Sequence, residues 1–260
     1  MNTTQFTVAR LNVLTHPTRL RMGTAAAEQA AQTIQEAIAK NRSARIIFAC
    51  SPSQKEFMVC LTAFHNVDWS KATIFHIDEY VGLPENHPAS FRSFHQKHLL
   101  SKITPAAFHG IRGESLDPEA ECRRYAALLE EAPIDLLCMG IGENGHIAFN
   151  DPPAADFQDP FPVKVVELDR TSRQQQVDDG CFSDIASVPT KAITLTCPTL
   201  LAAKRLVCVV PGPRKAAAIS NTLRAATISP LIPATVLRLH PGATLHIDSQ
   251  SARFLTSLRR

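Results

Sequence analysis

The chain of 260 residues lacks the features that mark three common classes of protein. It contains no run of 18 apolar residues, so no segment is expected to span a membrane. Its N-terminus is polar and has no apolar core of the kind found in secretion signals. A net charge of +3, with only 20% charged residues, is too small and too dispersed for nucleic-acid binding. We therefore expect a cytoplasmic protein that binds neither membranes nor nucleic acid.

The seven cysteines show none of the paired Cys-x-x-Cys spacing typical of metal or redox sites. Four of them lie in apolar surroundings, namely Cys50, Cys60, Cys138 and Cys208. We expect reduced thiols inside a hydrophobic core. His95 and His98 have the spacing of a metal-binding pair on a helix, but no third ligand is evident, so no metal site is predicted.

Strands alternate with helices along the chain, and neither an internal repeat nor a low-complexity tract interrupts them. Helices are expected at residues 22–41, 56–64, 90–100, 118–131, 215–225 and 251–258. Strands are expected at residues 44–50, 72–77, 134–138, 163–166, 192–196, 205–210 and 243–247. This order predicts an α/β, Rossmann-like fold, a mostly parallel sheet with helices on both faces. A chain of this length can form one core, so we expect a single domain over residues 1–260.

A glycine-rich turn follows the apolar strand expected at residues 134–138. Gly140, Gly142 and Gly145 allow the backbone to turn tightly and to approach a ligand, and His146 comes directly afterwards. In open α/β sheets, ligands bind at the carboxyl ends of the strands. The polar residues Asn144, His146, Asn150 and Asp151 are therefore placed where a binding site is expected.

Two adjacent carboxylates, Asp78 and Glu79, follow a second strand, expected at residues 72–77. Side chains alternate along a strand, so one carboxylate can face a ligand while the other serves the structure. A carboxylate beside apolar walls can have a pKa suited to proton abstraction. The alternative is a helix cap or a solvent-exposed pair without a ligand.

Together these stretches resemble the glucosamine-6-phosphate deaminase family, part of a wider group with 6-phosphogluconolactonases and ribose-5-phosphate isomerases. The resembling residues occur in family order at 75–84, 87–88, 93–94, 140–152, 188–189, 192–195, 215–216 and 237–241. The resemblance extends from about residue 26 to residue 246. Lactonases share the Gly-His element but usually continue without Ile-Ala-Phe-Asn-acid, which favours the deaminase branch.

The resemblance implies an aldose–ketose isomerase and deaminase that converts glucosamine-6-phosphate and water to fructose-6-phosphate and ammonia. Asp78 would act as the base at carbon 2, and His146 would move the proton that opens the sugar ring. Asn144 and Asp151 would orient His146, although better-known deaminases often have aspartate and glutamate there. The implied reaction needs no cofactor or metal, and family members are often homo-oligomers. The alternatives are a related phosphosugar isomerase, a 6-phosphogluconolactonase, or a sugar-phosphate sensor without catalysis.

Phosphate binding is the part of the pattern in which this chain departs most from the family. The family usually has a Gly/Thr-rich turn after its first core strand, whereas this chain has Ser51-Pro52-Ser53-Gln54 without glycine. The Ser51 and Ser53 hydroxyls and the N–H groups of Ser53 and Gln54 are candidates for binding phosphate, with Ser53 capping the next helix. A plain helix cap without a ligand is the alternative. Lys215 matches a family lysine that contacts phosphate.

The polar segment at about residues 166–188 is expected to be a lid or, alternatively, a surface excursion. The arginine of the family's lid has no clean counterpart here, because its place falls near Asp179, an acid that would repel phosphate. Arg173 is the remaining candidate within the segment. Glu79, Gly142 and Gly145 complete the candidate residues for substrate binding.

Overall fold

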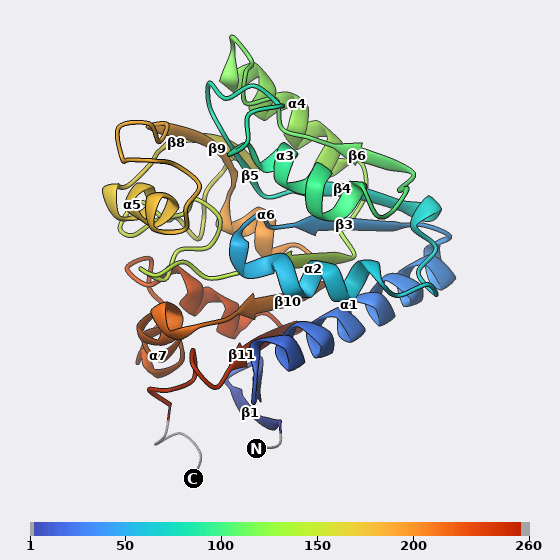
Figure 1. The fold of residues 1–260 in the computed structure, drawn as a ribbon, viewed down its shortest axis with the longest axis vertical. Coiled ribbons are helices and arrows are strands. Elements are labelled where there is room, and N and C mark those ends of the chain that lie inside the picture. The colour runs from blue at the N-terminus through green and yellow to red at the C-terminus, as the bar shows by residue number, and fades with distance from the viewer. Residues whose placement is uncertain (1–2, 256–260) are drawn as a thin grey trace.

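The computed structural model describes residues 3–255, and its centre is a sheet of eight strands (Figure 1). In spatial order the strands are β1 (Thr4–Val8), β2 (Leu11–His16), β11 (Ala243–Asp248), β10 (Arg205–Val210), β7 (Leu136–Met139), β3 (Ala44–Phe48), β4 (Ala72–His76) and β6 (Ala107–His109). All neighbours pair in parallel except β1 and β2, which form an antiparallel hairpin at one edge. The predicted α/β fold with a mostly parallel sheet is confirmed.

Helices cover both faces of this sheet (Figure 1). The α-helices are α1 (Arg19–Asn41), α2 (Lys55–Thr62), α3 (Phe91–His95), α4 (Pro118–Glu130), α5 (Arg170–Asp178), α6 (Cys197–Leu201) and α7 (Ala216–Arg224). The shorter helical turns are η1 (Pro52–Gln54), η2 (Trp69–Lys71), η3 (Gln96–Leu100), η4 (Pro213–Lys215) and η5 (Pro233–Leu239). Within residues 3–255, none of the helices combines the length and the apolar character needed to cross a membrane.

The side chains of the central strands divide between two apolar clusters, as alternation along a strand requires. Ile46 packs with buried residues of α1 and α2 on one face. Its neighbour Ile47 packs with residues of α4, α6 and α7 on the other. Both isoleucines have no exposed surface. The central strands are therefore apolar on both faces, and polar residues follow only where the strands end.

Three strands form a second, antiparallel sheet in the order β5 (Asp78–Tyr80), β9 (Lys191–Leu195), β8 (Val163–Glu167). The strands at 163–166 and 192–196 were expected to belong to the mostly parallel sheet, and that expectation is wrong. The chain leaves β4 at Ile77, whose carbonyl accepts a hydrogen bond from the Leu195 N–H (2.9 Å). From there Asp78 pairs with Thr194. Alternation of apolar residues predicts a strand but does not say which sheet the strand joins.

Several elements differ from the sequence-based prediction, at both ends of the chain and within it. The β1–β2 hairpin was not predicted, nor were β6, α5 and α6. A helix was expected at residues 251–258, but residues 251–254 form turns, and residues 256–258 lie outside the described part of the chain. The Asp248 carboxylate accepts a hydrogen bond from the Ser251 N–H (2.8 Å), and the Ser251 hydroxyl accepts one from the Asp248 N–H (3.1 Å). This reciprocal pair closes a turn at the point where the helix was expected to begin.

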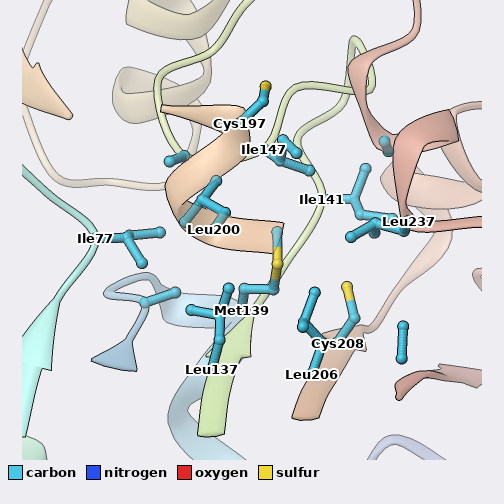
Figure 2. Close-up of a cluster of buried hydrophobic side chains, with 14 of the residues drawn as sticks. Ile77, Leu137, Met139, Ile141, Ile147, Cys197, Leu200, Leu206, Cys208 and Leu237 are labelled. Carbon is cyan, nitrogen blue, oxygen red and sulfur yellow. The ribbon is translucent and has the colours of Figure 1, made fainter. Parts of the chain in front are cut away.

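A buried apolar cluster supports the loops that follow β4 and β7 (Figure 2). Ile77 precedes Asp78, and Ile141 and Ile147 flank the histidine of the glycine-rich turn. All three point into the same cluster as Leu137 and Met139 of β7 (Figure 2). These loops are therefore anchored by their own apolar residues, which leaves the polar residues between them facing outward.

Leu137→Ala is expected to lower the free energy of unfolding by about 2–5 kcal/mol, because it leaves a cavity in a fully buried position. The measurement is chemical denaturation of the variant beside the wild type. Leu116→Ala is the matched control, since Leu116 is fully exposed and should change stability by no more than about 0.5 kcal/mol. Equal effects of the two substitutions would contradict the assignment of Leu137 to the core.

Candidate active site

A cavity lies at the carboxyl ends of the four adjacent parallel strands β10, β7, β3 and β4. Most of its polar lining residues come from the segments that follow these strands: Ser51 and Ser53 after β3, Asp78 after β4, His146 after β7, and Lys215 after β10. The backbone of Gly140 and Gly142 completes the wall beneath His146. This is the place where ligands bind in open α/β sheets.

His146 is held by a compact group of polar side chains. Its Nδ1 atom lies 3.0 Å from Asp151 Oδ1 and 3.1 Å from the Ser172 hydroxyl. Asn144 closes the group: its Nδ2 donates to Asp151 Oδ1 (2.9 Å) and its Oδ1 accepts from the His146 N–H (3.0 Å). An Nδ1–H donated to the carboxylate leaves Nε2 as the nitrogen that can accept or release a proton.

Asp151 is the ionised partner in this group. Burial by itself would raise the pKa of Asp151, but hydrogen bonds from His146, Asn144 and Ser172 outweigh it and lower the pKa. The Ser172 hydroxyl also donates to the same carboxylate oxygen that faces His146. The 3.0 Å separation from Nδ1 shows that the shorter aspartate still reaches the histidine.

The glycines of the turn make room for His146. A Cβ atom at position 142 would lie 2.1 Å from His146 Cε1, well inside contact distance. Gly145 has a φ of +88°, which only glycine adopts readily, and its N–H bonds to the Gly142 carbonyl (3.1 Å). Gly142 lines the cavity, whereas Gly145 shapes the turn outside the cavity wall.

The adjacent carboxylates Asp78 and Glu79 face different surroundings. Asp78 lines the cavity and is 6% exposed. Burial raises the pKa of Asp78 well above its usual range, and the nearby charges of Glu79 and Asp151 raise it further. The carboxyl group is therefore poised to hold or release a proton at a higher pH than an ordinary aspartate.

Glu79 is fully buried and lies outside the lining of the cavity, contrary to its predicted role in substrate binding. Its carboxylate accepts hydrogen bonds from the backbone N–H groups of Tyr80, Phe91 and Arg92, each at 3.0 Å. Burial raises the pKa of Glu79 to about 7, although these hydrogen bonds and the Arg92 charge oppose the rise. Glu79 thus links the start of α3 to β5, while its neighbour Asp78 faces the cavity.

The cavity also carries hydroxyl and ammonium groups. The Ser51 and Ser53 hydroxyl oxygens are 2.5 Å apart and both line the cavity. Lys215 is 8% exposed, and burial lowers the pKa of its ammonium group despite the opposing charges of Glu143 and Asp179. Within the described part of the chain the ammonium makes no hydrogen bond or ion pair. A buried cation without a partner is suited to an anionic ligand.

Gln54, one of the predicted phosphate contacts, has its donors engaged within the protein. The Gln54 N–H bonds to the Ser51 carbonyl (2.9 Å), and its side-chain amide donates to the Val209 carbonyl (3.1 Å). Gln54 therefore braces the loop against β10 and lies outside the cavity lining. Ser53 does not cap α2 either, because the segment begins with the helical turn η1 at Pro52 and no side-chain oxygen caps it.

Arg173, the remaining arginine candidate, is also outside the cavity lining. Its guanidinium group donates to the carbonyls of Ile185 (2.6 Å) and Val188 (2.9 Å), so it closes the 166–188 segment on itself. Asp179, expected to repel phosphate, forms an ion pair with Arg214. Its negative charge is therefore balanced locally.

The 166–188 segment contributes three residues to the site that sequence reasoning missed. Asp169 caps α5 by accepting from the Thr171 N–H (2.7 Å). The helix then places Ser172, Gln175 and Gln176 on one face, toward His146 and the cavity. The cap signal was present in the sequence, and the spacing of these three residues is that of one helical face. Nothing in the sequence indicated that this face would meet His146.

The two histidines with metal-like spacing do not act as a pair. His95 is buried with its Nε2 atom 2.7 Å from Cys50 Sγ, whereas the His98 ring packs at a tilt against Phe94. One ligand atom each of Cys50, His76 and His95 lies within 4.8 Å of the other two. However, His76 Nε2 already accepts from the Ile111 N–H (2.8 Å), which occupies the lone pair that a metal would need. All seven cysteines are free thiols, as predicted.

Comparison with known proteins agrees with this geometry. Residues 17–246 match the family described as glucosamine-6-phosphate isomerases/6-phosphogluconolactonase, and the chain belongs to that family. A glucosamine-6-phosphate deaminase of an Exiguobacterium species is 35% identical over 188 residues, 72% of this chain and 71% of the relative. One of Bacillus thuringiensis is 36% identical over 189 residues, 72% of this chain and 69% of the relative. The predicted family is confirmed.

Solved structures show the same fold. A monomeric glucosamine-6-phosphate deaminase is 32% identical and superimposes with a TM-score of 0.86 over 93% of this chain and 98% of that chain. A 6-phosphogluconolactonase of Shewanella baltica superimposes with a TM-score of 0.73 over 94% and 97% of the two chains, but is only 18% identical. The second likeness shows the shared fold alone.

Ser172→Ala is expected to lower kcat/KM by about 5- to 10-fold, because it removes a hydrogen bond worth about 1 kcal/mol from His146 and Asp151. The measurement is steady-state kinetics with the sugar phosphate on which the wild type is active. Ser183→Ala, an exposed serine of the same segment, is the control and should leave kcat/KM unchanged. Equal rates for Ser172→Ala and wild type would show that Ser172 does not position the histidine.

Proposed function

We propose that this protein is a deaminase and isomerase that converts glucosamine-6-phosphate and water to fructose-6-phosphate and ammonia. The observation that carries the proposal is that one cavity holds groups of opposite polarity. A buried carboxyl group, Asp78, and an unpaired ammonium, Lys215, line the cavity together with two serine hydroxyls. An amino sugar phosphate has the matching charges, a cationic amine near carbon 2 and an anionic phosphate on carbon 6.

In the first step of this mechanism, His146 opens the sugar ring. The ring oxygen receives a proton as the bond to carbon 1 breaks, and the hydroxyl on carbon 1 loses its proton to give the open aldehyde. His146 can carry both proton transfers through Nε2, because Asp151 and Ser172 hold its Nδ1 side. The ionised Asp151 stabilises the imidazolium formed in between.

In the second step, Asp78 moves a proton between adjacent carbons. Its carboxylate removes the proton from carbon 2, giving an enolamine, and returns it to carbon 1. The resulting imine at carbon 2 is hydrolysed by water, which releases ammonia and leaves the ketose. Ionisation of Asp78 is disfavoured by burial, and a substrate ammonium beside it would offset that penalty. A sugar lactone has no amine and would provide no such compensation.

The remaining residues bind substrate in this proposal. Lys215 and the hydroxyls of Ser51 and Ser53 would bind the phosphate, and the backbone at Gly142 would allow the sugar to approach His146. The 166–188 segment would act as a lid, since Gln175 and Gln176 border the cavity from α5. These roles need no metal and no organic cofactor.

Asp78→Asn is expected to reduce kcat for ammonia release by about 100- to 10,000-fold, because the amide cannot accept the proton from carbon 2. The pKa of Asp78 is raised on folding, so stability is lost as pH rises from the unfolded pKa of about 3.9 through the folded value. The isosteric amide removes that penalty, and the variant should be at least as stable as wild type at pH 7.

The assay is ammonia release from glucosamine-6-phosphate, with galactosamine-6-phosphate and 6-phosphogluconolactone tested in parallel. Deuterium from solvent should enter carbon 1 of the ketose during turnover. Asp178→Asn, an exposed aspartate of α5, is the matched control and should retain wild-type activity. Lactone hydrolysis without ammonia release from either amino sugar would sink the proposal in favour of a lactonase. Sugar-phosphate binding without any turnover would support the alternative of a sensor without catalysis.

Lys215→Gln is expected to raise KM for glucosamine-6-phosphate by about 10- to 100-fold, because it removes one charge-assisted hydrogen bond to phosphate. The change in kcat should be small, because in the proposed mechanism the phosphate takes no part in the proton transfers of Asp78 and His146. Steady-state kinetics separate the two parameters. Lys191→Gln is the control, since Lys191 is exposed on β9 and pairs only with Glu167. A KM unaffected by Lys215→Gln would place the phosphate elsewhere.

A further inference from the structure

The cavity continues beyond Lys215 into a second recess that the proposed reaction does not yet use. The recess shares Ser51, Ser53, Gln175 and Lys215 with the cavity. Its additional charged lining residues are Arg19, Asp179 and Arg214. The recess therefore begins where the phosphate of the substrate would lie, and it places further basic side chains there.

The two arginines of the recess, Arg214 and Arg19, differ in the number of carboxylates with which they pair. Arg214 forms ion pairs with both Asp179 and Glu143, so its charge is already matched by two carboxylates. Arg19 has one carboxylate partner, Glu56, at 2.7 Å, and donates from the same Nη2 atom to the Pro52 carbonyl (2.9 Å). Arg19 is thus the less neutralised of the two arginines.

The donors of Arg19 are only partly used. A guanidinium group has five N–H donors, and the contacts to Pro52 and Glu56 both involve Nη2. Within residues 3–255 no contact of the Nη1 atom is found, and the side chain is 40% exposed. Nη1 therefore has donors for an anion that enters the recess, in the planar geometry that suits phosphate.

Arg19 also lies where this chain lacks two phosphate contacts that its family usually has. The loop after β3 has no glycine, and Arg173 is turned into its own segment. Arg19 begins α1 and holds the carbonyl of Pro52, the residue between the two serines of that loop. It is therefore placed beside the same hydroxyls as Lys215, but from a different part of the chain.

We propose that Arg19 is a phosphate-binding residue that acts with Lys215, Ser51 and Ser53, and that Glu56 competes with the phosphate for its guanidinium group. This inference rests on the proposed function for the identity of the sugar, but not for the binding of phosphate itself. This competition makes Glu56 a determinant of the affinity for phosphate, because removing the Glu56 carboxylate frees Arg19 for the ligand. No other residue of the recess combines an accessible cation with a single competing carboxylate.

The test measures the affinity of the intact protein for inorganic phosphate by titration calorimetry, beside KM and kcat for glucosamine-6-phosphate. Arg19→Gln should weaken phosphate binding and raise KM by about 10- to 100-fold with little change in kcat. Glu56→Gln should have the opposite effect and tighten phosphate binding by at least about 3-fold. Arg21→Gln, an exposed arginine of the same helix that lines no part of the recess, is the matched control.

A purely structural role for Arg19 predicts a different result. If the residue only braces the loop at Pro52, Arg19→Gln lowers the melting temperature and Glu56→Gln does not tighten phosphate binding, and the proposal is overturned. Should Arg19→Gln fail to fold, the response of phosphate affinity to Glu56→Gln decides alone. Phosphate binding that depends on Arg19 in a protein without deaminase activity would support the subsite and contradict the proposed reaction.

Discussion

Burial of β7 between β10 and β3 is the constraint on which the rest of the structure depends. Leu136 and Cys138 pack toward α1 and α2, and Leu137 and Met139 pack toward the helices of the other face. A strand covered on both faces and hydrogen-bonded on both edges leaves no place for a polar side chain along its length. Polar chemistry can begin only where the strand ends. Because its neighbours end at the same level, with Phe48 beside Cys138, their polar residues meet at one edge of the sheet.

The electrostatic design of the site follows from that arrangement. Asp78 after β4 brings a carboxyl group to the cavity, and residues after β3 and β10 bring hydroxyls and an ammonium group to it. Burial raises the pKa of Asp78 and lowers that of Lys215, so each group gains from a ligand of opposite charge. The site also depends on α5, since Ser172 joins His146 to Asp151 only when the 166–188 segment lies against the glycine-rich turn. Binding of the substrate and placement of that segment are therefore linked through one hydroxyl group.

Sequence reasoning was most accurate where a local rule decides the outcome. The parallel sheet follows from alternating strands and helices. The glycine-rich turn follows from the space that His146 needs, because a Cβ atom at position 142 would collide with its ring. It was least accurate where two segments far apart in the chain must meet. Arg173 was a candidate in place of the family's lid arginine, yet it bonds to the carbonyls of Ile185 and Val188. Gln54 was a candidate through its backbone N–H at the start of a helix, yet that N–H bonds to the Ser51 carbonyl and the side-chain amide bonds to Val209 on β10.

The sequence by itself determined the fold class, the family, and the set of polar residues that follow the central strands, because each of these depends on patterns within a few residues. Only the tertiary structure decided which member of a neighbouring pair faces the cavity, as with Asp78 and Glu79, because the turn from β4 into the second sheet sets the direction of both side chains. It likewise decided that Ser172 and Arg19 lie beside the site. Their places depend on how α5 and α1 pack against distant strands, and the free energy of that packing is shared among many apolar contacts that no short motif records.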